Sequence, residues 1–175
     1  DHYMMALDAL WHESIGLYLN RDTGTGAWIE RLGPTLFYPL LTGRVPAERQ
    51  VRMLDAHLCN SEEFWGDYPV PTIARNDPAF ADQSYWRGRV WAPTNLLVYL
   101  GLIRAGAHQV AQALACKGNA MFLRNWRERG IIGENYNGID GSAGERSNSD
   151  PFNSWGALLA LVGLDAAGAI PPLPR

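Results

Sequence analysis

The sequence predicts an all-α fold in which helices alternate between an outer and an inner layer, the arrangement of an α/α toroid. Six helical segments follow one another, and segments with one apolar face alternate with segments that are apolar on nearly every side. No stretch shows the alternating pattern that is typical of a strand. A plain bundle is the alternative, but helices that are apolar all round fit poorly at its edge. We therefore expect three antiparallel hairpins, about half of a closed toroid.

The composition is ordinary for one globular domain. The chain has 175 residues, 47% of them hydrophobic and 19% charged, which is enough to bury one core. A net charge of −3 without a Lys/Arg run argues against a nucleic-acid partner. The longest apolar run, Gly156 to Leu164, is too short to cross a membrane, and no signal peptide is visible. We expect a soluble protein and slightly favour the cytoplasm, although a chain that starts at Asp1 without Met reads as a fragment or processed product.

The cysteines and histidines give no sign of a metal site. Cys59 and Cys116 are far apart, fall in predicted helices and are interpreted as buried free thiols. The histidines lie scattered on polar helix faces and show no HExxH-like spacing; they are His2, His12, His57 and His108. We expect neither a metal nor a cofactor.

The first three predicted helices occupy the amino-terminal part of the chain. An amphipathic helix is predicted for His2 to Glu13, and a turn cluster for Asn20 to Gly26. Pro34 to Leu41 is apolar on nearly all sides and contains Pro39, which suits a buried, kinked helix. An amphipathic helix then follows Pro46 and runs to about Leu58.

Two long loops each lead into a buried helix. Residues 60–85 have no helical period but contain many apolar residues, so we expect an ordered loop before a buried helix from Pro93 to about Ala105. An amphipathic helix from Ala107 to Arg129 precedes the second loop, 131–150. Asp150 and Pro151 form a good cap and first residue for the last buried helix, which runs to about Leu164. Both loops should meet at the same end of the inner layer and form a rim there.

The end of the first loop carries the sequence Tyr-Trp-Arg-Gly-Arg-Val-Trp at residues 85–91. Flat rings beside forked donors suit a ligand with both C–H faces and hydroxyl groups, as a sugar has. The alternative is that Trp86 and Trp91 are core anchors and that Arg87 and Arg89 are surface charges. The second loop adds Glu134-Asn135-Tyr136-Asn137, and Trp155 lies one turn into the last helix. A carboxylate ringed by tryptophans favours carbohydrate chemistry over a solvated glutamate.

These motifs resemble the C-terminal half of glycoside hydrolase family 63. The resemblance rests on residues 85–95 (YWRGRVWAPTN), 134–137 (ENYN) and 149–158 (SDPFNSWGAL), in the family's order, with further similarity at 69–78 and 10–13. That family includes processing α-glucosidase I and bacterial mannosylglycerate or glucosylglycerate hydrolases, and it is related to trehalases. The resemblance covers nearly the whole chain.

The resemblance implies an (α/α)6 barrel that hydrolyses an α-glycosidic bond with inversion, residues 1–175 being the C-terminal half of its catalytic domain. By the same resemblance, Glu134 corresponds to the general base. The residues expected to line the sugar site are Trp86, Trp91 and Trp155, and Arg87 is expected to contact the substrate. From its place beside Glu134 in the sequence, Tyr136 is expected to orient Glu134 or the attacking water. The family's general acid is an aspartate in the earlier half of the barrel, and no residue here matches its motif.

The expected partners are therefore a carbohydrate, either an α-glucoside or a glycosylglycerate, and the first half of the barrel in the same or another chain. Two alternatives remain open. A non-catalytic sugar-binding or structural module would keep the aromatic rim without the acid. Another toroid enzyme, such as a sugar epimerase, would need a pair of histidines at the rim, where the second loop and the inner helices carry none.

Overall fold

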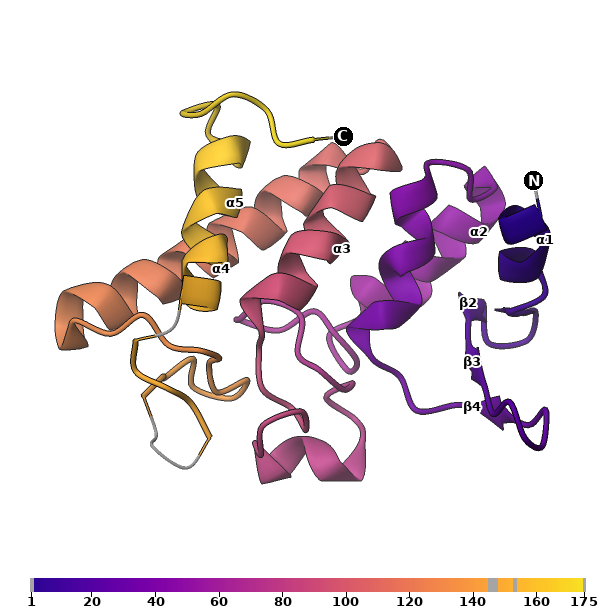
Figure 1. Ribbon diagram of the computed structural model, residues 1–175, viewed down its shortest axis with the longest axis horizontal. Helices are drawn as coiled ribbons and strands as arrows, with labels where there is room; N and C mark the ends of the chain where they lie inside the picture. The colour runs from indigo at the N-terminus through magenta and orange to yellow at the C-terminus, as the bar shows by residue number, and fades with distance from the viewer. Residues whose placement is uncertain (1, 145–147, 153, 175) are drawn as a thin grey trace.

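The computed structural model describes residues 2–144, 148–152 and 154–174 and shows a mostly helical chain (Figure 1). Three helices form one layer: the 3-10 helix η1 (Pro34–Thr42), α3 (Ala92–Arg104) and α5 (Leu158–Ala166). α3 packs against both of the others. Behind them lie α2 (Ala47–Arg52) with its π-helical continuation η2 (Met53–Leu58), and the long α4 (His108–Arg129) (Figure 1). The predicted alternation of inner and outer helices is confirmed for these elements.

Proline and glycine set the helix ends where the sequence predicted them. Pro93 lies in the first turn of α3, where its missing N–H costs nothing. Gly106 separates α3 from α4 with a φ of 76°. Gly130 ends α4 in the left-handed conformation, and its N–H returns to carbonyl groups of the last turn.

The first predicted hairpin is wrong in part. α1 (His2–Asp8) is shorter than the predicted helix and buries no residue. β1 (Trp11–His12) instead pairs antiparallel with β2 (Leu17–Tyr18), and β3 (Asn20–Arg21) pairs with β4 (Trp28–Ile29), so the expectation of no strands was also wrong. Trp11 lies opposite Tyr18 with ring centroids 5.1 Å apart, a cross-strand contact that ends the helical path.

The last inner helix begins later than predicted. Residues 151–152 run beside Ile132 as a parallel bridge, and the Asp150 carboxylate accepts a hydrogen bond from the Phe152 N–H at 2.9 Å. The 3-10 turn η4 (Ser154–Ala157) then leads into α5. The predicted cap at Asp150 is therefore wrong, because that carboxylate closes a loop turn.

Two further side-chain expectations need correction. Cys116 is exposed and Cys59 only half-buried, although both were expected to be buried. His57, expected on a polar face, is buried: its Nδ1 lies 2.7 Å from Glu63 Oε2 and its Nε2 lies 2.8 Å from the carbonyl oxygen of Ile15. A buried imidazole with two acceptors ties η2 to the amino-terminal hairpin and the first long loop.

The inner helices are only partly covered. α3 buries one face through Val98, Tyr99 and Leu102, but the apolar side chains on its other side are half-buried. On α5, Leu164 is 45% exposed. Within the described part of the chain, these inner helices are therefore buried on one face and only partly covered on the other, as expected for half of a closed toroid. Among the described residues, no helix is both long and apolar enough to cross a bilayer.

Both long loops lie at the end of the inner layer where α3 and α5 begin (Figure 1). The first loop is ordered as predicted: it contains the 3-10 helix η3 (Pro78–Asp82) and buries Phe64, Val70 and Phe80. This end of the molecule is called the rim below.

Candidate functional site at the rim

A backbone bridge joins the two long loops. The Val90 N–H donates to the Tyr136 carbonyl at 2.8 Å, and the Tyr136 N–H donates to the Val90 carbonyl at 2.9 Å. A second link runs from the Gly138 N–H to Gln83 Oε1 at 2.6 Å. A Cβ at position 138 would collide with the carbonyl oxygen of Gly88, so this close approach requires glycine. The bridge brings Glu134 next to the segment 85–91.

The three predicted tryptophans converge at the rim. The rings of Trp86 and Trp91 stack with centroids 4.0 Å apart and an interplanar angle of 10°. Trp155 lies 6.0 Å from Trp91, tilted by 58°. Trp86 and Trp155 are each 50% exposed, whereas Trp91 is fully buried. Two of the rings therefore offer surface to a ligand, and Trp91 supports them from below.

Glu134 is linked to this cluster through Tyr85. The Tyr85 hydroxyl donates to Glu134 Oε1 at 2.8 Å. The Tyr85 ring meets Trp91 edge-on at 4.8 Å and Trp86 edge-on at 5.9 Å. The hydrogen bond to Glu134, together with its negative charge, raises the pKa of Tyr85, so the phenol stays protonated as a donor. A carboxylate held beside exposed aromatic rings is an arrangement that suits sugar chemistry.

Tyr136 occupies a different position from the one that the sequence suggested. Its side chain is buried, and burial raises its pKa to about 12, with a backbone contact from Gly133 acting in the opposite direction. Within the described residues its hydroxyl makes no hydrogen bond of normal geometry. The phenol that donates to Glu134 is that of Tyr85, a residue of the sequence motif to which no role had been assigned.

The two arginines of the motif have different environments. Arg87 is exposed, and its Nε lies 3.4 Å from Asp82 Oδ2. Arg89 is fully buried and donates to Asn135 Oδ1 and, at 3.2 Å, to the Gln83 carbonyl. The interpretation of Arg89 as a surface charge is therefore wrong. Its guanidinium connects the first loop to Asn135, the residue after Glu134.

Sequence reasoning missed Gln83 and Asn135 as buried polar links between the loops. Amides are common in loops, and only the close approach of the two loops gives these two their partners. No group of three or more His, Cys, Asp or Glu side chains suited to a metal ion occurs in the described residues.

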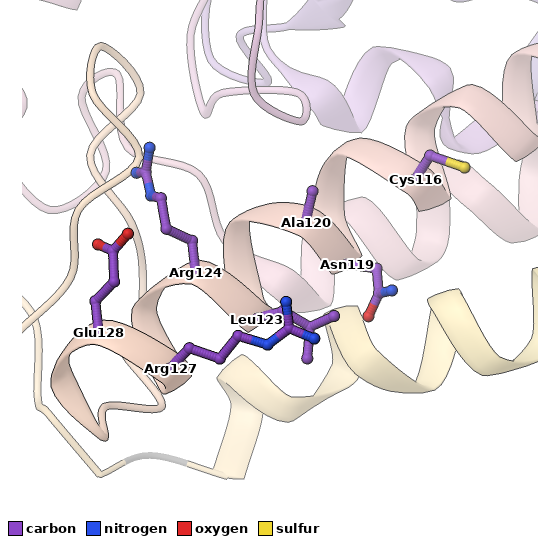
Figure 2. Close-up of a pocket in the computed structure, with 7 residues that line it drawn as sticks. All are labelled: Cys116, Asn119, Ala120, Leu123, Arg124, Arg127 and Glu128. Carbon is purple, nitrogen blue, oxygen red and sulfur yellow. The ribbon is translucent and has the colours of Figure 1, made fainter.

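A separate groove of about 490 Å³ runs along the outward side of α4 (Figure 2). Its lining comes from α4 alone: Cys116, Asn119, Ala120, Leu123, Arg124, Arg127 and Glu128. Glu128 is the one carboxylate in this lining, and none of the rim aromatics contributes. The groove lacks convergent groups that would do chemistry, so the rim remains the candidate site.

Comparison with known proteins assigns the chain to a family. The family model of the mannosylglycerate hydrolase MGH1-like glycoside hydrolase domain matches residues 3–155. Mannosylglycerate hydrolase of Thermus thermophilus is 31% identical over 90% of this chain and 35% of its own length. A probable mannosyl-oligosaccharide glucosidase of Schizosaccharomyces pombe is 25% identical over 74% of this chain and 17% of its own length.

Solved structures agree with this assignment. The crystal structure of a family 63 mannosylglycerate hydrolase from Thermus thermophilus, in complex with glucose, is 27% identical with a TM-score of 0.76 and covers 90% of this chain. The neutral trehalase of Saccharomyces cerevisiae, 19% identical with a TM-score of 0.71, shares the fold. The predicted (α/α)6 barrel fold is thus confirmed, and this chain forms about half of it.

The chain spans 35% and 37% of the lengths of the two Thermus proteins compared above. The family match nevertheless covers most of this chain and includes both rim motifs and Trp155. The chain therefore belongs to the mannosylglycerate hydrolase MGH1-like family of glycoside hydrolases, within glycoside hydrolase family 63.

Proposed function

We propose that residues 1–175 are the C-terminal half of an (α/α)6 glycosidase domain that hydrolyses an α-glycosidic bond with inversion. The observation that carries this proposal is the Glu134 carboxylate beside the tryptophan rim, linked to it by the Tyr85 hydroxyl. A carboxylate next to stacking rings can act on a water molecule while the rings hold a sugar. Family membership supports the reaction class.

Each rim residue has a role in this proposal. Glu134 removes a proton from the attacking water, whose oxygen bonds to the anomeric carbon from the face opposite the leaving group. Trp86 and Trp155 stack on the sugar through their exposed rings, and buried Trp91 supports both. Arg87 binds a sugar hydroxyl or an anionic aglycone from its exposed position. Tyr136 supports the site from beneath through its backbone pairing with Val90.

The reaction needs a second carboxyl group that protonates the leaving oxygen. Inverting enzymes keep the two carboxyl groups roughly 6.5–9.5 Å apart, so that water fits on one side of the sugar. We assign the acid to the first half of the barrel, in the same or another polypeptide, which would also cover the half-exposed flanks of α3 and α5. No cofactor is required, because two carboxyl groups suffice for the proton transfers.

The substrate class follows from the relatives, which carry the names mannosylglycerate hydrolase and mannosyl-oligosaccharide glucosidase. We propose an α-glucoside, or a mannosyl- or glucosylglycerate whose carboxylate could pair with Arg87. The panel for testing is mannosylglycerate, glucosylglycerate, trehalose and p-nitrophenyl α-glucoside, offered to the intact enzyme.

The decisive variant is Glu134→Gln in the intact enzyme. It removes the base but keeps the shape and hydrogen bonding of the side chain, so turnover should fall about 10²-fold or more while sugar binding persists. Glu128→Gln, the same change on α4, should leave turnover unchanged.

Near-normal turnover of Glu134→Gln would refute the role of Glu134. A wild-type protein that binds sugars of the panel but cleaves none would instead favour the alternative, a non-catalytic sugar-binding module.

A further inference from the structure

We propose that Tyr85 is a positioning residue that fixes one oxygen of the Glu134 carboxylate and leaves the other free to accept the proton of the attacking water. This inference rests on the proposed function. The Tyr85 hydroxyl donates to Oε1 at 2.8 Å, whereas Oε2 lies 3.5 Å from the Asp150 N–H. Oε1 is thus engaged by a strong donor and Oε2 only weakly. The carboxylate is anchored through one oxygen, and Oε2 is the one that can turn to water.

The backbone of Tyr85 shows that its position is imposed by its surroundings. Its φ is 35°, in the left-handed region that a bulky side chain rarely adopts. Gln83, two residues earlier, has a φ of 46°. Such conformations persist where neighbouring contacts over-determine them, and they are frequent at functional sites.

Those contacts are present around Tyr85. The indole Nε1 of Trp91 donates to the Tyr85 carbonyl at 2.9 Å, and the Arg87 N–H donates to the Ser84 carbonyl at 2.6 Å. The Tyr85 ring is held edge-on against both Trp86 and Trp91. Because the backbone and the ring of Tyr85 are both constrained, the hydroxyl group is held in a fixed orientation toward Glu134.

Glu134 is constrained from the opposite side. Its N–H donates to the Asp150 carbonyl at 2.8 Å, and the Val90–Tyr136 bridge holds the loop two residues later. Tyr85 and Glu134 come from different loops, so their hydrogen bond forms only when the two loops pack correctly against each other. The orientation of the base therefore depends on a tyrosine 49 positions away in the chain.

The test is Tyr85→Phe in the intact enzyme, assayed on the substrate of the panel above that the wild type cleaves fastest. The ring and its edge-on contacts remain, and only the donor is lost. We expect kcat to fall about 10-fold with little change in KM, because a donor to a charged oxygen is lost.

Tyr68→Phe is the matched control, because the Tyr68 hydroxyl also takes part in a hydrogen bond, with Arg124 at 3.2 Å, outside the site. It should leave kcat and KM unchanged. Calorimetry then measures binding of the free sugar that the reaction releases. Binding to Tyr85→Phe at wild-type affinity establishes that the variant is folded and its sugar site intact.

The outcomes separate the two proposals. If Glu134→Gln abolishes turnover while Tyr85→Phe leaves kcat unchanged, the positioning role is overturned and the proposed function stands. A rise in KM with normal kcat overturns it as well, since Tyr85 would then be a sugar ligand. If Glu134→Gln remains active, the proposed function itself fails, and the role of Tyr85 fails with it.

Discussion

At the residue scale, the segment Arg87-Gly88-Arg89 shows how two identical side chains acquire opposite roles. Gly88 has a φ of 92°, and a Cβ there would collide with the carbonyl of Phe80. The chain turns at this glycine, which leaves Arg87 in solvent beside Asp82 and sends Arg89 into the protein beside Asn135. The sequence could not distinguish them, because burial here depends on a backbone conformation that only glycine allows.

This difference predicts unequal effects of the same substitution. Arg89→Met should lower the free energy of unfolding by about 3 kcal/mol, because it leaves the buried Asn135 oxygen and Gln83 carbonyl without their donor. Arg87→Met should change it by no more than about 0.5 kcal/mol, since exposed ion pairs contribute little. Urea unfolding of the intact enzyme measures both values. Equal losses for the two variants would show that Arg89 does not link the loops.

At the element scale, helix positions were predictable where proline and glycine set the ends, as for α3 and α4. The amino-terminal hairpin was not. Trp11 continues the apolar spacing of α1, and only its cross-strand contact with Tyr18 makes it part of a strand. Local periodicity does not report such a partner. The start of α5 was missed for a similar reason, because residues 151–152 form a parallel backbone bridge with Ile132 instead of the first turn of the helix.

Close packing of η1 against α3 depends on Gly101. This glycine is buried, and a Cβ would lie 3.1 Å from Leu40 Cβ and 3.5 Å from the Leu41 nitrogen. Gly101→Val should lower the free energy of unfolding by about 2 kcal/mol, because overpacking outweighs the gain in helix propensity.

Ala120→Val on the exposed side of α4 is the control for this substitution and should cost about 0.5 kcal/mol. Thermal unfolding of the intact enzyme compares the two variants. A neutral Gly101→Val would mean that η1 and α3 can separate without loss of stability.

At the scale of the whole molecule, the convergence of the rim residues could be expected from the sequence. Both long loops precede inner helices and lie at one end of the layer (Figure 1), so residues of the two loops were expected to meet there. The hydrogen bond from Tyr85 and the burial of Tyr136 could not be predicted, because they depend on the register of the Val90–Tyr136 bridge. The burial of Trp91 agrees with the alternative that this residue is a core anchor. A motif identifies which residues meet but leaves open which of them faces solvent.

The half-exposed apolar side chains of α3 and α5 bear on how the complete barrel is assembled. We propose that another element of the barrel covers this apolar surface. Because α3 and α5 begin at the rim (Figure 1), an element that covers these helices would also bring a second wall to the site. We therefore link the covering of α3 and α5 to the supply of the general acid.

The most direct test of this account is the rate of glycoside hydrolysis by residues 1–175 alone, measured beside the molar mass of the segment in solution. We predict no turnover of mannosylglycerate or of p-nitrophenyl α-glucoside, together with self-association through the apolar flanks. Turnover should require the remaining barrel helices and should disappear again with Glu134→Gln. A monomeric segment that unfolds cooperatively and hydrolyses either substrate by itself would contradict the claim that the second carboxyl group comes from outside these residues.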